Sequence, residues 1–183
     1  CQKCQYCLEG KEYLCESSTI TGESFKGGYT EYITVHENFA TLVPDTMKSE
    51  YAAPLFCAGI TAYKAVKAAE PKKHKKIGIF GIGGVGHMAV QFAKVENCDV
   101  IAFSRSQNHL DVAKRLGALD VMTFSENQEK FLFSLKEKHG FLDASIVFAP
   151  SDIVTDTAIK SVKKGGLIII ATVGENPSFL AFE

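Results

Sequence analysis

The sequence predicts an α/β protein whose larger part is a doubly wound parallel sheet with helices on both faces. Two patterns carry this prediction. From residue 77 onward, near-continuous apolar runs of strand length alternate with stretches of helical periodicity. Strands that are covered by helices on both faces have such near-continuous apolar sequences. In addition, the first apolar run is followed at once by a cluster of glycines.

The glycine cluster occupies residues 81–86 and lies between the apolar run Ile77–Phe80 and a helical pattern. Gly81 permits a tight turn, Gly83 lets the backbone approach a pyrophosphate, and Gly86 lets the helix pack closely on the strand. The start of the helix offers unpaired N–H groups and the positive end of its dipole to phosphates. A purely structural glycine turn is the alternative. The strand–turn–helix context favours a Rossmann-type dinucleotide site made by Gly81, Gly83, Gly84, Val85 and Gly86.

The later apolar and periodic stretches predict the remaining elements in alternating order. Strands are expected at 99–103, 121–124, 144–149 and 167–173, and helices at 85–93, 110–116, 131–139 and 153–162. Gly117 is a natural C-terminal cap for the second of these helices. Ligands of such sheets bind at the carboxyl ends of the strands, so Ala149, Val173 and Gly174 are expected to line the nicotinamide side.

The end of the predicted second strand decides which cofactor the site prefers. NAD-specific sites place Asp or Glu there to bond the ribose hydroxyls, whereas this chain has Ser104, Arg105 and Ser106. A carboxylate would repel a 2′-phosphate, but a guanidinium and two hydroxyls can bind it. A solvent-facing Arg105 on a turn is the alternative. We predict NADP(H), with His109 as a further residue that could reach the phosphate.

Four cysteines near the N-terminus follow the pattern C-x2-C-x2-C-x7-C: Cys1, Cys4, Cys7 and Cys15. Four thiolates held by short loops make a closed tetrahedral site that suits structural zinc. An iron–sulfur cluster is the main competitor, but its motif continues with C-x3-C-P. Disulfides are a third possibility, although adjacent C-x2-C turns favour metal. A metal would hold together a lobe that has few apolar residues.

The stretch between the cysteines and the first predicted strand divides into two parts. Residues 20–48 are rich in Thr and Gly and predict β structure, with a strand over Tyr29–Val35. Residues 54–66 predict a helix with one face formed by Cys57, Ile60, Tyr63 and Val66. By itself, Cys57 is either a small buried side chain or a thiolate favoured by the helix N-terminus.

Composition excludes some classes of partner. The chain of 183 residues has 20 basic and 21 acidic side chains, which gives no electrostatic basis for binding nucleic acid or an anionic membrane. No apolar run approaches a membrane-spanning length, and no secretory leader is recognisable. We therefore expect a cytoplasmic protein that acts on a small molecule, with no nucleic-acid or membrane partner.

Several of these motifs together carry a family resemblance. The cysteine lobe, residues 27–32 (GGYTEY), residues 54–63 (PLFCAGITAY) and residues 81–87 (GIGGVGH) resemble the zinc-dependent medium-chain alcohol dehydrogenases, in the family's order. Within them the chain looks most like the NADP-dependent cinnamyl alcohol dehydrogenase-like branch. The resemblance implies that the four clustered cysteines bind structural zinc, that Cys57 is the last protein ligand of a catalytic zinc, and that Thr61 lies close to the cofactor.

The resemblance also implies a domain organisation and a departure from the family. Residues 1–56 would be part of a GroES-like catalytic domain with its zinc lobe, and residues 57–183 a Rossmann NADP-binding domain that is incomplete at its C-terminus. The family's other catalytic zinc ligands, Cys and a His-Glu pair, and its proton-relay hydroxyl would precede the cysteine lobe. We therefore expect the chain to be an internal piece of an enzyme and inactive alone.

The expected function is hydride transfer between NADP(H) and an alcohol/aldehyde pair by a zinc-dependent oxidoreductase that is a homo-oligomer at full length. A quinone or enone reductase of the same superfamily that lacks catalytic zinc is one alternative. The other is a non-catalytic NADP(H)-binding sensor.

Overall fold

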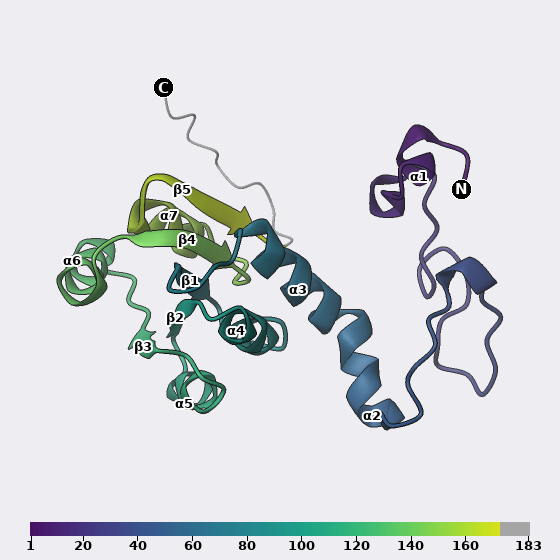
Figure 1. The fold of residues 1–183 in the computed structure, drawn as a ribbon, viewed down its shortest axis with the longest axis horizontal. Helices are drawn as coiled ribbons and strands as arrows, with labels where there is room; N and C mark the ends of the chain where they lie inside the picture. The colour runs from purple at the N-terminus through teal and green to yellow at the C-terminus, as the bar shows by residue number, and fades with distance from the viewer. Residues whose placement is uncertain (173–183) are drawn as a thin grey trace. The chain divides into compact units, whose positions relative to one another are not determined.

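The computed structural model describes residues 1–172, which form two units that divide between Pro44 and Asp45 (Figure 1). The predicted domain boundary between residues 56 and 57 stays a prediction. Each unit has its own architecture. The first is irregular and short of apolar burial, whereas the second contains a parallel sheet with a large core.

The N-terminal unit, Cys1–Pro44, contains only short helices: α1 (Gln5–Leu8), η1 (Glu12–Leu14) and η2 (Glu37–Phe39). Within this unit, which the structure describes completely, Cys15 is the single buried residue. A segment without an apolar core cannot offset the entropy of ordering its backbone by hydrophobic burial. Its order must therefore come from another source, and the cysteine cluster is the candidate.

The β structure predicted for residues 20–48 is wrong. The strand expected over Tyr29–Val35 is irregular backbone, and the unit contains just an isolated bridge between Thr21 and Phe25. Tyr29 and Tyr32 are fully or largely exposed. The alternation of residue types was real, but a strand needs a hydrogen-bonded partner, and no described segment pairs with this one.

The second unit begins with α2 (Ser49–Ala52), η3 (Ala53–Phe56) and α3 (Ala58–Ala68). Pro54 stands in the first turn of η3, as predicted for a helix start. Of the face predicted for this helix, Val66 is buried and Tyr63 packs on Phe92 of α4 at 5.6 Å between ring centroids, whereas Cys57 and Ile60 are exposed. Most of the buried face consists of small residues that the periodicity did not mark: Gly59, Ala62, Ala65 and, at the C-terminal cap, Ala69.

Five parallel strands form the sheet in the order β3-β2-β1-β4-β5, which confirms the predicted doubly wound topology. The strands are β1 (Lys76–Phe80), β2 (Asp99–Ser104), β3 (Asp120–Thr123), β4 (Leu142–Val147) and β5 (Val162–Ile170). The helices are α4 (Gly86–Val95), α5 (Gln107–Arg115), α6 (Gln128–His139) and α7 (Asp152–Ser161). Among the described helices, none is long and apolar enough to cross a membrane.

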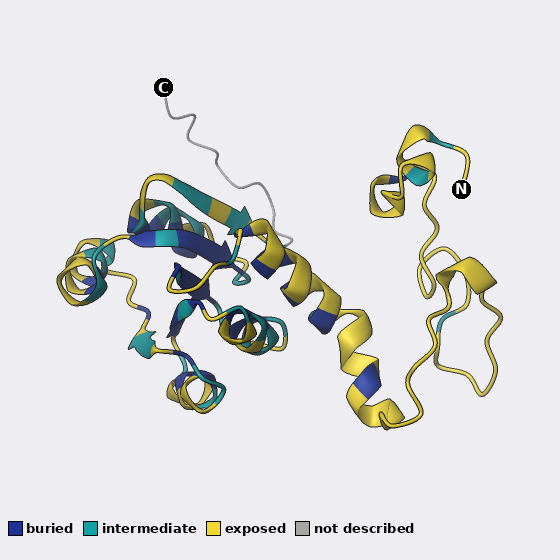
Figure 2. Ribbon diagram, viewed as in Figure 1, coloured by how far each residue is buried: buried dark blue, intermediate teal, exposed yellow. Residues whose placement is uncertain are grey.

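Alternate residues of the central strands enter two separate cores, as the period of a strand requires. Ile77 and Ile79 of β1 pack with α3, α4 and Ala113 of α5 on one face of the sheet. Phe80 faces the other side, where it stacks on Phe103 at 4.3 Å between ring centroids and joins α6 and α7. Figure 2 shows that burial is concentrated in β1, β2 and β4.

The connector before β1, residues 71–76, is basic. Its Lys75 is nevertheless buried, and the ammonium donates to Glu70 O at 3.1 Å. The last strand begins at Val162 rather than Leu167, and a shift of register between Leu142 and Ala144 of β4 accommodates Gly165 at φ +74°. Gly165 and Gly166 therefore lie within β5, at an irregularity in its pairing with β4.

Carboxylates tie the starting ends of the strands to neighbouring elements. Asp143 accepts from the backbone N–H of Lys76 at 2.8 Å and pairs with the Lys163 ammonium. Burial alone would raise the pKa of Asp143, but these hydrogen bonds outweigh it and hold the pKa below its ordinary value. The pKa of Asp120 is lowered in the same way, because the bonds from Lys138 and His139 outweigh the effect of burial.

We predict that Asp143→Asn makes the fold less stable at neutral pH but not in acid. A depressed pKa in the folded state gives stability that is present above the unfolded pKa of about 3.9 and is lost as the pH falls through the folded pKa. The variant should lose ~1 kcal/mol of unfolding free energy at pH 7. Urea unfolding at pH 7 and pH 3 measures the difference, which should narrow in acid. Asp111→Asn, on an exposed position of α5, is the control and should show no such trend.

Candidate functional site

A cavity of about 690 Å³ opens at the carboxyl ends of β1, β2 and β4. The chain turns to opposite faces of the sheet after β1 and after β4, and ligands of doubly wound sheets bind at such a switch point. The cavity combines apolar walls with the glycine loop and a short polar segment after β2. Its shape and lining suit an extended ligand with a phosphate and an apolar ring.

The glycine loop is held so close to its neighbours that two of its positions exclude any side chain. Gly81 has φ +97°, and a Cβ there would lie 2.9 Å from the backbone N of Ala149. A Cβ on Gly86 would lie 2.0 Å from Gly81 O. By contrast, Cβ atoms on Gly83 and Gly84 would point into open space. The first two positions therefore shape the turn, and the other two leave room for a ligand.

The polar segment after β2 faces the same cavity. Ser104 is buried and its hydroxyl accepts from the backbone N–H of Ser106 at 3.2 Å. Arg105 lines the cavity, and no carboxylate of residues 1–172 is paired with it. His109, in the first turn of α5, also lines the cavity. Within residues 1–172, a cation without a paired carboxylate therefore stands at the end of β2.

The structure brings most of the predicted cofactor residues together. One cavity is lined by Gly81, Gly83, Gly84, Val85, Gly86, Ser104, Arg105, Ser106 and Ala149. Val173 and Gly174 lie outside the described residues. Sequence reasoning missed several lining residues, chiefly Phe124 and Glu126 after β3 and Ile153 and Val154 in the first turn of α7. Their places near the carboxyl ends of β3 and β4 were the available signal, but no motif marks them.

Cys57 and Thr61 lie apart from that lining. Both are exposed, and the backbone N–H of Thr61 donates to Cys57 O at 3.1 Å across the first turn of α3. Cys57 is the N-cap residue of α3, and its side chain makes no capping hydrogen bond. Within residues 1–172, it belongs to no group of three or more candidate metal ligands.

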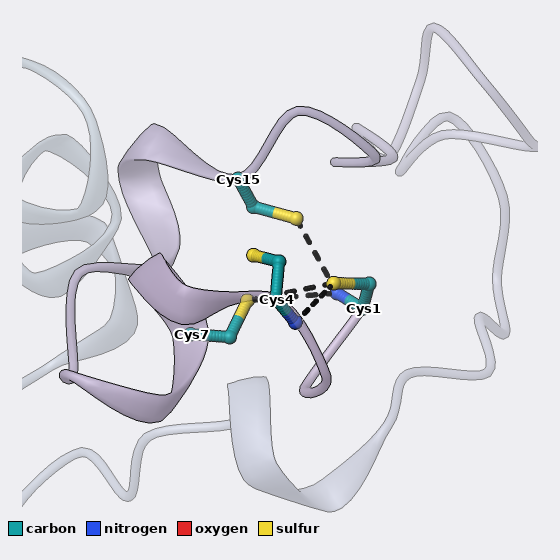
Figure 3. A group of neighbouring side chains, drawn as sticks. All are labelled: Cys1, Cys4, Cys7 and Cys15. Atoms are coloured by element: carbon teal, nitrogen blue, oxygen red, sulfur yellow. Dashed lines mark hydrogen bonds between the residues drawn. The ribbon is translucent and has the colours of Figure 1, made fainter.

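The four N-terminal cysteines converge, as Figure 3 shows. Their Sγ atoms lie within 4.8 Å of one another, and those of Cys1 and Cys7 are 3.8 Å apart. Two ligands of a tetrahedral ion with Zn–S bonds of ~2.3 Å stand about 3.8 Å apart. Cys4 and Cys7 are supplied by the start of α1 and Cys15 by the end of η1. The cluster therefore fits one zinc ion, whereas several iron atoms would hold the sulfurs farther apart.

Hydrogen bonds within the cluster favour thiolate at one of its members. Burial opposes ionisation of Cys7, but bonds from the Gln2 backbone and from the Cys4 and Cys15 thiols outweigh it and lower the pKa of Cys7. The Cys4 backbone N–H also donates to Cys1 Sγ at 3.4 Å. Four sulfurs this close repel one another once ionised, and a divalent cation removes that repulsion.

The comparisons with known proteins agree with this geometry. Residues 84–182 match the family described as zinc-binding dehydrogenase, and residues 1–45 match the alcohol dehydrogenase GroES-like domain. The first match covers more than half of the chain and is a dehydrogenase family. The chain therefore belongs to the zinc-dependent medium-chain alcohol dehydrogenases, which confirms the resemblance. The cinnamyl alcohol dehydrogenase-like branch stays a prediction.

Individual relatives show how much of a family member the chain represents. It is 39% identical over 170 residues to an alcohol dehydrogenase of Geobacillus stearothermophilus, covering 93% of this chain and 50% of the relative. An alcohol dehydrogenase of Aeropyrum pernix superposes with a TM-score of 0.83 at 31% identity, over 100% of this chain and 54% of that one. Acetophenone reductase of Geotrichum candidum, solved with NAD, has a TM-score of 0.83 at 29% identity, over 97% and 52%. The chain thus spans about half the length of the curated relatives it matches.

We predict that alanine at Gly83 weakens cofactor binding, whereas alanine at Gly86 lowers the stability of the fold. Gly83→Ala should keep the fold, because its Cβ meets nothing, but weaken dinucleotide binding about tenfold by blocking close approach. Gly86→Ala should destabilise the protein by ~2 kcal/mol or more, since its Cβ collides with the Gly81 carbonyl. Urea unfolding and cofactor titration of both variants separate the two effects. Equal behaviour of the variants would contradict this division of roles.

We predict that the cysteine cluster binds one zinc ion and that Cys7→Ser lowers the zinc content by about one ion per chain. Chelation should unfold residues 1–44, because this unit has no buried core of its own. Elemental analysis and limited proteolysis measure the two effects. Cys98→Ser, at a buried thiol that donates to Lys72 O, is the control and should keep its zinc. Iron with visible absorbance would contradict the zinc assignment.

Proposed function

We propose that the chain is part of a zinc-dependent oxidoreductase that transfers a hydride between NADP(H) and an alcohol/aldehyde pair. The observation that carries the proposal is the cavity at the switch point, where the glycine loop and the segment Ser104–Ser106 face one space. Family membership supports the reaction type, since the matched family consists of dehydrogenases. Because the chain spans about half of its relatives, the activity belongs to the whole protein.

The charge at the end of β2 supports NADP(H) rather than NAD(H). The guanidinium of Arg105 is unpaired within residues 1–172 and can form two parallel hydrogen bonds to a 2′-phosphate. Ser104 and Ser106 line the same cavity, so their hydroxyls can add hydrogen bonds to a phosphate. Glu126 is the acidic residue in the lining, and it follows β3 rather than β2. A ribose-binding carboxylate is therefore missing from its usual position in the described chain.

Two metal roles follow from the cysteines. Cys1, Cys4, Cys7 and Cys15 would hold structural zinc, which the sulfur spacing supports. Cys57 would supply one thiolate to a catalytic zinc, whose chemistry is to polarise a carbonyl as a Lewis acid. The exposed position of Cys57 at the start of α3 keeps its sulfur accessible to a metal ion.

A non-catalytic NADP(H)-binding sensor is the second candidate. The observation that favours it is the separation of Cys57 from any group of three ligands within residues 1–172. Zinc bound at Cys57 in the whole protein would distinguish the two candidates, because a sensor has no need of a Lewis acid. The zinc-independent quinone or enone reductase is disfavoured by the presence of Cys57 itself.

We predict that this chain binds NADPH more tightly than NADH and that Arg105→Asp reverses the order. The substitution removes a cation from the phosphate site and adds a repulsive carboxylate, so NADPH affinity should fall by a factor of about 100. Side-by-side fluorescence titrations measure both affinities. Arg115→Asp, on the last turn of α5 outside the cavity lining, is the matched control. Equal affinity of the unaltered chain for the two cofactors would overturn the preference for NADP(H).

A further inference from the structure

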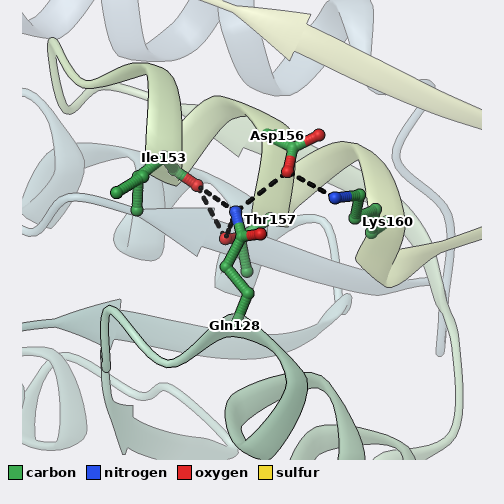
Figure 4. Close-up of polar contacts among 5 residues, drawn as sticks. All are labelled: Gln128, Ile153, Asp156, Thr157 and Lys160. Atoms are coloured by element: carbon green, nitrogen blue, oxygen red, sulfur yellow. Dashed lines mark hydrogen bonds and ion pairs between the residues drawn. The ribbon is translucent and has the colours of Figure 1, made fainter.

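The side chain of Gln128 bridges the helices α6 and α7, as Figure 4 shows. Gln128 is the first residue of α6, and its amide nitrogen reaches three acceptors on α7. The distances are 3.2 Å to Ile153 O, 2.9 Å to Asp156 Oδ2 and 3.0 Å to Thr157 Oγ1. One side chain thus holds the first turn of α7 against the start of α6.

The acceptors on α7 are themselves fixed. Thr157 is completely buried, and its hydroxyl donates to Ile153 O at 2.6 Å. Asp156 pairs with Lys160 at 2.6 Å, one turn farther along α7. The hydrogen bond from Lys160, helped by the one from Gln128, holds the pKa of Asp156 below its ordinary value. The bridge therefore joins a charged carboxylate and a buried hydroxyl, where hydrogen bonds are stronger than at a neutral exposed pair.

The anchored turn of α7 forms part of the cavity wall. Ile153 and Val154 line the cavity, as does Phe124 from the loop before α6. Phe124 packs on Phe131 of α6 at 5.2 Å between ring centroids, within the core that also contains Val154. Because Phe124 and Val154 belong to both this core and the cavity lining, we expect the spacing of α6 and α7 to set the width of an apolar slot between them. A flat aromatic base requires such a slot.

The base that this slot would take is the adenine of the cofactor. Phosphate groups belong at the glycine loop, and the ribose phosphate belongs at Arg105. The apolar residues Phe124 and Ile153 line the same cavity as these polar groups, so they can cover the ring that is attached to that ribose.

We propose that Gln128 is a positioning residue for the adenosine end of the cofactor: it fixes the first turn of α7 so that Ile153 and Val154 hold one wall of the base slot. The inference rests on the proposed dinucleotide function. Gln128 itself does not line the cavity, so it acts through α7 and touches no ligand.

The test compares Gln128→Leu, which removes the donors at similar volume, with Gln128→Asn, which keeps the amide but shortens its reach. Both variants should bind NADPH and adenosine 2′,5′-bisphosphate five- to tenfold more weakly, and the factor should be about the same for the two ligands. A loss of this size corresponds to the net free energy of about one hydrogen bond. Isothermal titration should give an unchanged number of sites per chain. Gln91→Leu, on an exposed position of α4 whose amide donates to His87 O, is the control and should bind like the unaltered chain.

Three outcomes overturn the proposal. Unchanged affinities in both variants show that α7 holds its place without Gln128. Fewer sites at unchanged affinity show a general folding role instead of positioning. Weaker binding of NADPH with unchanged binding of the adenosine bisphosphate places the effect away from the base. If the unaltered chain binds no adenine dinucleotide at all, the proposed function is wrong, and this inference is wrong with it because it rests on that function. If it binds NADH better than NADPH, the same comparison is made with NADH and 5′-AMP.

Discussion

The approach of α4 to the turn after β1 is the constraint on which the cavity depends. Gly86 lies so close to the Gly81 carbonyl that no side chain fits between them, and a Cβ on Gly81 would lie 2.9 Å from the backbone N of Ala149. These two contacts bring the ends of β1 and β4 and the start of α4 to one point. Because the contacts are between backbone atoms, the position of the helix N-terminus does not depend on rotamers. A phosphate would therefore meet preorganised N–H groups, which lowers the entropic cost of binding.

The two units of the chain rely on different physics. In the second unit, alternating strand residues fill two cores, one with α3 and α4 and one with α6 and α7. Hydrophobic burial is sufficient there to order the chain. In the first unit only Cys15 is buried, so the convergence of four sulfurs is its main organising contact. Metal affinity and folding of this unit should accordingly be one equilibrium, and conditions that protonate thiolates should act on both together.

The sequence predicted the sheet well because its signals are local. Each apolar run after residue 76 ends at a glycine, a polar turn or a cap, and the structure places a strand at every one of them. The strand predicted over Tyr29–Val35 failed because pairing is non-local, and no run of residues reveals whether a partner exists. The face of α3 was predicted only in part. Periodicity marked Tyr63, which packs on Phe92 of α4, and the buried Val66, but it missed the alanines that form most of the buried face and let the two helices approach closely.

The candidate site was predictable where a motif carries the chemistry and not where the walls come from tertiary packing. The glycine loop and Ser104–Ser106 were found because backbone approach and phosphate charge restrict the residue types that can serve. Phe124, Ile153 and Val154 obey no such restriction, because any apolar side chain of suitable size can form a wall. What makes these three a slot is the spacing of α6 and α7, and the bridge from Gln128 to α7 helps to determine that spacing. On this proposal, cofactor affinity depends also on residues such as Gln128 that do not contact the cofactor. A sequence motif made of contacting residues alone therefore leaves out some of the residues on which binding depends.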